Sequence, residues 1–201
     1  MEKKTVVKSK KKESKPKEEQ DSQWQFKFLI DQFSKESDRA AVILVASIID
    51  ENLGTLLKSY LVPNPSSSDS LFDSATSPLS NFSSKIDLCF RIGIISGKLT
   101  RDLHIIRKIR NSFAHDIYGC SFENGSVRSR IRELENSVSN KWINQMSEVK
   151  RSDDLLEGTR GKFIFITGAI IWEITDKISE IKELKESEIE WFYIDSKEPS
   201  A

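Results

Sequence analysis

The 201-residue sequence predicts an all-α fold, a single helical bundle of about five to seven helices with disordered termini. Two observations support this prediction. In several long segments apolar residues recur every three or four positions, which is the period of an amphipathic helix. No two alternating apolar segments are joined by a short turn, as they would be in a β-hairpin. Hydrophobic residues make up 37% of the chain, which is enough for one packed core.

The N-terminal region is rich in Lys, Glu and Ser and has almost nothing apolar to bury. Such a segment cannot offset the entropy lost on ordering, so residues 1–21 are expected to form a disordered basic arm. A basic arm that contacts nucleic acid is the functional alternative to a solvated tail. The bundle is expected at residues 22–186 and a flexible C-terminal tail at residues 187–201.

The first two expected helices are separated by polar residues that can cap a helix. Trp24, Phe28 and Phe33 predict a short amphipathic helix. Ser34 and Ser37 are both candidate N-caps for the long apolar helix that follows, which should run to about Leu61. Two prolines follow this segment and would end the helix.

The middle of the chain predicts a loop and two helices. Residues 64–77 are rich in Ser, Asp and Pro and are expected to form the loop. A helix then runs to about Ser96, with Gly97 as its C-terminal stop. The next helix starts near Leu99 and has two adjacent apolar stripes, as expected for a central helix. The first stripe contains Leu103, Ile106, Arg110 and Phe113, and the second contains Ile105 and Ile109.

Two more helices complete the predicted bundle. A polar helix is expected at residues 127–136, and the stretch after it carries Trp142 and other apolar residues that could pack. The last helix begins near Thr159, and its isoleucines recur at intervals of three or four. A β-strand over residues 163–171 is the alternative, but its alternating pattern fails after Ile166.

Charge and cysteine content argue against several classes of protein. The 31 basic and 31 acidic residues give zero net charge, whereas nucleic-acid-binding proteins usually have a basic excess. We find no apolar run of the roughly 18 residues that span a bilayer and no secretory signal, so no membrane association is expected. Cys89 and Cys120 lie in no metal-binding pattern, which indicates free thiols in a reducing compartment. We therefore expect a cytoplasmic protein without a cofactor or metal.

One stretch of the predicted central helix concentrates reactive groups. Residues 107–116 contain three cations, an amide, an imidazole and a carboxylate. An arginine can bind a phosphate through a forked pair of hydrogen bonds, and a histidine can transfer a proton near neutral pH. On an ideal helix Arg110 and His115 are about 140° apart. They would converge only across a two-fold dimer, or if the helix ended or bent near Ala114.

A structural interpretation of the same residues stays open. The residues expected to stabilise the structure or to contact a partner are Asp38, Arg39, Asp50, Glu51 and Arg107. Arg110 would then be a buried or half-buried arginine that pairs with a carboxylate such as one of the three in this set. His115 would be a cation at a helix C-terminus, where it interacts favourably with the helix dipole.

Several short motifs follow one another along the chain. They are Glu-Ser-Asp-Arg-Ala-Ala at residues 36–41, Asp-Glu-Asn-Leu at 50–53, Phe-Ser-Ser-Lys-Ile at 82–86, Gly-Ile-Ile at 93–95 and the segment from Asp102 to His115. Motifs of this kind occur in the same order in the mannitol operon repressor (MltR) family, and residues 32–122 resemble that family. The resemblance implies an all-α bacterial transcriptional regulator without a recognisable helix-turn-helix. We therefore expect a regulator that is not an enzyme and acts through a protein partner, with direct DNA binding as a further alternative.

The segment Arg110-Asn111-x-x-x-His115 is also similar to the signature of the HEPN superfamily. These small helical domains include metal-independent ribonucleases, in which the signature lies at a dimer cleft. The resemblance implies an alternative function, an endoribonuclease that acts as a homodimer. Arg110 would hold the scissile phosphate, His115 would be the general base on the ribose 2′-hydroxyl, and Asn111 would orient the pair.

Overall fold

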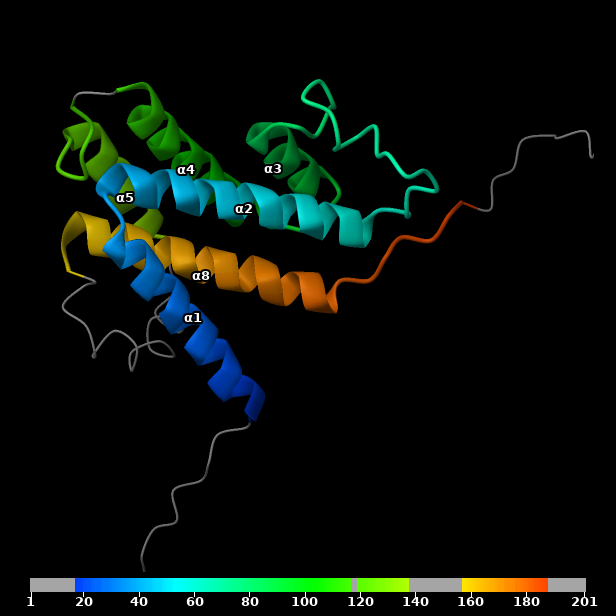
Figure 1. Ribbon diagram of the computed structural model, residues 1–201, viewed down its shortest axis with the longest axis horizontal. Helices are drawn as coiled ribbons and strands as arrows, with labels where there is room; N and C mark the ends of the chain where they lie inside the picture. Colours follow the sequence, from blue (N-terminus) through cyan, green and yellow to red (C-terminus); the bar gives the residue numbers. More distant parts are fainter. Residues whose placement is uncertain (1–16, 117–118, 138–156, 188–201) are drawn as a thin grey trace, which may run out of the picture.

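The computed structural model describes residues 17–116, 119–137 and 157–187, which form a helical bundle (Figure 1). These ranges contain no strand, so the all-α prediction is confirmed for them and the strand alternative at residues 163–171 is wrong. The helices in these ranges are α1 (Lys17–Lys35), α2 (Asp38–Tyr60), α3 (Phe82–Arg91), α4 (Gly97–His115), α5 (Gly125–Glu135) and α8 (Gly158–Glu180).

The helix α2 is the centre of the bundle. It contacts α1, α3, α4 and α8, and Figure 1 shows α8 along one side of α2 with α3 and α4 on the other. Of the two N-caps that the sequence offered, Ser37 is the one used, and its side chain accepts a hydrogen bond from the main-chain N–H of Ala40. The buried residues of α2 are Ala41, Val42, Val45, Ala46, Ile49, Leu53, Gly54, Leu56 and Leu57.

By length and composition alone, α2 could cross a membrane. It contains an 18-residue window with a mean hydropathy of 1.7, which the sequence prediction overlooked. Half of that window is buried inside the protein. The core helix of a bundle has the same apolar composition, because it is covered by other helices on several sides. The central position of α2 therefore accounts for its hydropathy.

The helix α1 crosses α8 at a glycine. An ideal Cβ on Gly168 would lie only 2.9 Å from Ile30 Cδ1 and 3.2 Å from Phe26 Cε2, so the side chains of α1 lie almost on the backbone of α8. The Phe26 ring also meets Phe165 edge to face, with 5.7 Å between the ring centroids. The absence of a side chain at Gly168 thus allows α1 to pack on α8 this closely.

The prediction for α1 was only partly right. Phe33 is buried as expected, but Phe28 is 50% exposed, and the buried face instead contains Phe26 and Ile30. The helix begins at Lys17, before the expected start of the bundle at residue 22. The side chain of Trp24 lies outside the part of α1 whose side chains are described.

The turn between α3 and α4 differs from its prediction. Gly97 does not end a helix; it is the first residue of α4. Gly93 is the residue that follows α3 in the left-handed region, with φ of 78°. Ser96 then caps α4 by accepting a hydrogen bond from the main-chain N–H of Leu99 at 3.2 Å. The helix was expected to continue through Gly93 to about Ser96, but it ends at Arg91, because the backbone turns at Gly93, four residues before Gly97.

Aromatic rings join α4, the loop before α5, and α8. Phe122, in the loop before α5, lies between Phe113 of α4 and Phe163 of α8, with ring centroids 5.3 Å and 5.4 Å away. The apolar stripes predicted for α4 are buried as expected. They contain Leu103, Ile105, Ile106, Ile109 and Phe113, whereas Arg110 is half-buried.

After α8 the chain passes the end of α2 as an extended segment. The N–H of Leu184 donates a hydrogen bond to the carbonyl oxygen of Tyr60 at 2.7 Å. The predictions for residues 1–16, for the stretch that includes Trp142 and for residues 188–201 lie outside the described part of the chain.

Two matched substitutions test the contact between α1 and α8. Gly168→Ala is expected to lower the free energy of unfolding by about 1 kcal/mol, because overpacking outweighs the better helix propensity of alanine. Gly54→Ala is the control, since its Cβ would meet only the Lys85 side chain at an ordinary 3.7 Å. The control should raise the free energy of unfolding by up to about 1 kcal/mol. Urea denaturation measures both, and effects of the same sign would contradict this packing.

Candidate functional site

The candidate site lies in the C-terminal half of α4. This helix continues to His115, with Asp116 as its C-cap, so it does not end at Ala114. Arg110 and Asn111 are half-buried and His115 is exposed. On an unbroken helix the side chains of Arg110 and His115 remain about 140° apart. One chain by itself therefore does not direct the two groups at the same point.

Asp38 pairs with α8 and not with Arg110. Its carboxylate lies 3.0 Å from Nε of Arg160. The Arg160 guanidinium also donates hydrogen bonds to the carbonyl oxygens of Ser34 and Glu36, at 3.2 Å and 2.5 Å. Arg160 thus joins the turn between α1 and α2 to the start of α8.

Asp50 pairs with α3. Lys85 Nζ donates to Asp50 Oδ1 at 2.8 Å and lies 3.3 Å from the Asp50 carbonyl oxygen. The Lys85 stem passes Gly54, where an added Cβ would be 3.7 Å from Lys85 Cε. Glu51 is exposed. The predicted pairing of Arg110 with one of these carboxylates is therefore wrong, and Arg110 has no hydrogen bond or ion pair within the described ranges.

Arg39 joins the start of α2 to the end of α4. Its Nη2 donates to the carbonyl oxygen of Asp116 at 2.5 Å, directly after His115. This bond satisfies one of the carbonyl groups that a helix C-terminus leaves without an intrahelical partner. Arg39 therefore has a structural role, and it adds positive charge at the end of α4 that carries His115.

Arg107 is the other arginine on this part of α4. It is half-buried, and its Nε is buried without a hydrogen-bond partner among the described residues. A buried N–H without an acceptor is unfavourable by about 1–3 kcal/mol. Arg107 and Asn111 are four residues apart and share one face of the helix.

The two histidines have different surroundings. His104 Nε2 lies 3.0 Å from Asp87 Oδ1, so His104 links α4 to α3. His115 is exposed at the helix end. Within the described ranges, no three His, Cys, Asp or Glu side chains are placed to hold a metal ion.

Both cysteines are free. Burial raises the pKa of the Cys89 thiol to about 12. The pKa of the half-buried Cys120 is also raised, first by desolvation and then by the charge of Asp116. Because the thiolate is the reactive form, neither cysteine is activated as a nucleophile at neutral pH.

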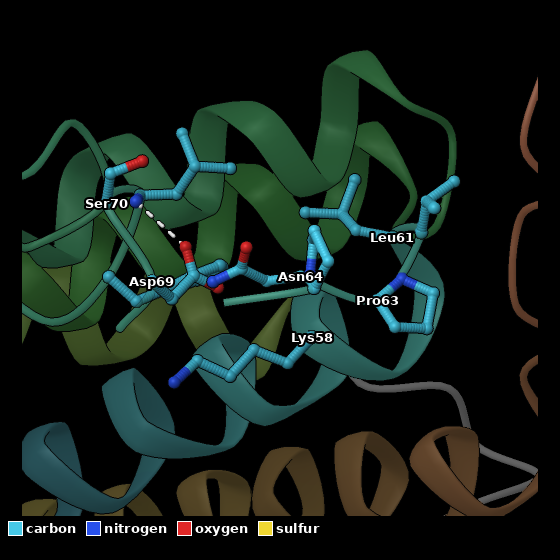
Figure 2. A pocket seen from close by; sticks show the side chains of 10 residues that line it. Lys58, Leu61, Pro63, Asn64, Asp69 and Ser70 are labelled. Atoms are coloured by element: carbon cyan, nitrogen blue, oxygen red, sulfur yellow. Dashed lines mark hydrogen bonds between the residues drawn. The ribbon is translucent and has the colours of Figure 1, made fainter. Parts of the chain in front are cut away.

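Two open hollows lie near the other end of α2. The first, of about 490 Å³, is formed by the last turn of α2 and the loop that follows, including Lys58, Leu61 and Leu71 (Figure 2). The second, of about 500 Å³, lies between this loop, α2 and Lys85 of α3. None of the predicted catalytic residues lines either one. Leu71 is one of two large apolar residues in an otherwise polar loop, and this was the weak signal for the hollows in the sequence.

Comparison with known proteins supports the fold of this chain. No family model matches the sequence, and no curated protein matches it. The chain is similar to a chain in the X-ray structure of the MtlR–HPr complex from Escherichia coli, with a TM-score of 0.50 and 16% sequence identity. The match covers 78% of this chain and 99% of that chain. The mannitol-repressor resemblance is thus supported at the level of the fold.

Arg160→Ala tests the polar contact between α8 and the turn that precedes α2. It should lower the free energy of unfolding by about 2–3 kcal/mol, because several carbonyl groups lose a charged donor together. Asp38→Asn is the control and should change it by less than about 1 kcal/mol, since the ion pair is partly exposed to solvent. Denaturant unfolding measures both changes. Equal effects would show that the ion pair, and not the carbonyl contacts, stabilises the turn.

Proposed function

We propose that this protein is a regulator similar to the mannitol operon repressor, which acts in the cytoplasm by binding a protein partner. The observation that carries the proposal is the fold shared with a chain of the MtlR–HPr complex. Nearly all of that chain is matched, so its helices have counterparts here. The zero net charge of this chain also favours a protein partner over nucleic acid.

The structure narrows the residues proposed to face the partner. Asp38, Arg39 and Asp50 are bonded within the bundle. Glu51 is exposed beside the second hollow, and Arg107 carries a buried N–H without an acceptor in the described part of the chain. We therefore propose that Glu51 on α2 and Arg107 on α4 contact the partner. Charged groups at such a surface chiefly determine specificity and the rate of association.

Titration calorimetry with HPr tests this proposal. We expect a complex with this protein, and Glu51→Lys should weaken it about tenfold, or about 1.4 kcal/mol. Glu133→Lys is the matched control, because Glu133 is an exposed glutamate on α5. The control should bind like the wild type. Absence of a complex would contradict HPr as the partner, and equal binding by both variants would contradict the role of Glu51.

A metal-independent ribonuclease of the HEPN type is the second candidate function. It is favoured by the surroundings of Arg110. Three carboxylates were the expected partners of this arginine, but within the described ranges Arg110 has no intramolecular partner. A half-buried guanidinium of this kind is suited to a phosphate. Because α4 continues to His115, the proposed site combines Arg110 and Asn111 of one chain with His115 of a two-fold partner.

An RNA-cleavage assay in the presence of EDTA tests this candidate. The wild type should produce 2′,3′-cyclic phosphate ends, and His115→Ala should reduce the rate by about 10²–10⁴-fold, as expected for loss of a general base. His104→Ala is the control, because His104 binds Asp87 on α3. It should retain wild-type activity. Equal cleavage by the wild type and His115→Ala, or no cleavage by either, would reject the ribonuclease.

A further inference from the structure

One face of α4 carries two arginines that no carboxylate balances. Arg107, Arg110, Asn111 and Ala114 fall within one sector of the helix of about 100°, which we call the arginine face. Residues 103–115 include no Asp or Glu. Neither arginine has an ion pair or a side-chain hydrogen bond to another described residue. Like charges three residues apart on a helix repel each other, so a bound anion would stabilise this face.

The carboxylates on the neighbouring turns and helices are engaged elsewhere. Three of them belong to α2, α3 and α4, and each binds a different side chain. The pairs are Asp50 with Lys85, Asp87 with His104, and Asp102 with Arg101. These carboxylates are therefore not available to the arginine face.

The helix α3 covers only the first part of the arginine face. It forms an antiparallel hairpin with α4, since residues 92–96 alone join the two helices. Asp87 of α3 meets His104 of α4, and α3 begins about five residues earlier, at Phe82. This register places Arg107 beside the first turn of α3, which accounts for its buried Nε. The later residues of the face lie beyond α3, where Figure 1 shows α4 extending towards the start of α2.

The arginine face lacks the apolar centre of a protein interface. Such interfaces are usually anchored by large apolar or aromatic side chains. None of the large hydrophobic side chains that are exposed in the described ranges belongs to α4, and the apolar member of the face is the small Ala114. Two guanidinium groups and an amide instead match phosphate oxygens, which accept forked hydrogen bonds. The face thus suits a strand of phosphates better than a folded protein.

We propose that Arg107 binds a second phosphate of an RNA strand, next to the phosphate that Arg110 holds. This inference rests on the ribonuclease candidate and names its substrate class. The substrate is a single strand that runs along α4 and is longer than a dinucleotide, because a dinucleotide has one internucleotide phosphate. Duplex RNA fits less well, since side chains cannot read its deep, narrow major groove.

Binding of a short 2′-O-methyl RNA strand tests this proposal, because such a strand lacks the hydroxyl that cleavage requires. Arg107→Met keeps an unbranched apolar stem and removes the charge. It should weaken binding about tenfold and should lower the slope of log K against log salt by about 0.7, the value for one phosphate contact on a single strand. Arg128→Met is the matched control, at an exposed arginine on α5. The control should leave both quantities unchanged.

The outcomes separate this inference from the ribonuclease itself. Equal binding by Arg107→Met and the wild type, an equal loss in both variants, or no binding by the wild type would overturn the second phosphate site. Binding that depends on Arg107 without cleavage in the EDTA assay would reject the ribonuclease and support the strand site. A weaker HPr complex with unchanged strand binding would assign the face to a protein partner and overturn the proposal.

Thermal unfolding distinguishes ligand binding from a structural role of Arg107. A buried N–H without an acceptor destabilises a fold, so the Tm of Arg107→Met should equal or exceed that of the wild type. Weaker strand binding at an unchanged or higher Tm would support the proposal. A lower Tm together with weaker binding would show that Arg107 stabilises the bundle, and would overturn it.

Discussion

The burial of α2 against four other helices is the constraint on which the bundle depends. Its buried apolar residues face these helices, and several of its polar residues bind different neighbours. Asp38 meets Arg160 on α8, Arg39 bonds to the end of α4, and Asp50 binds Lys85 on α3. Apolar burial brings the helices together without fixing their positions along α2. The polar contacts specify those positions, because each requires a particular pair of atoms to meet.

The polar contacts between helices explain why the mannitol-repressor resemblance indicates a fold more than a function. Several of its motif residues are used inside the bundle: Ser37 caps α2, while Asp38, Arg39, Asp50 and Lys85 join helices. Residues with such roles report how helices pack and do not report what the surface binds. The resemblance is accordingly strongest as a statement of fold, in agreement with the structural match at 16% identity. Activity has to be tested on residues outside these contacts, such as Glu51, Arg107, Arg110 and His115.

The end of α4 shows how tertiary structure restricts a motif. The resemblance to the HEPN signature implied a phosphate site at Arg110 and His115, but their spacing on a helix directs the two side chains apart. A break at Ala114 would have removed this conflict, but the helix runs through it to His115. Asp116 caps this end and Arg39 holds its carbonyl group. Convergence of the two groups therefore needs a second chain, which makes the oligomeric state part of the ribonuclease hypothesis.

The sequence by itself determined the helical class, the extent of α2, the start of α8 and the buried stripes of α4, because these follow from local periodicity and from caps such as Ser37. It did not determine the buried face of α1, where Phe26 and Ile30 pack and Phe28 does not, since that choice depends on the space above Gly168 of α8. It also could not show that Asp38 and Asp50 are bound by Arg160 and Lys85. Such pairings join residues far apart in the chain, so only the packed arrangement of helices decides them.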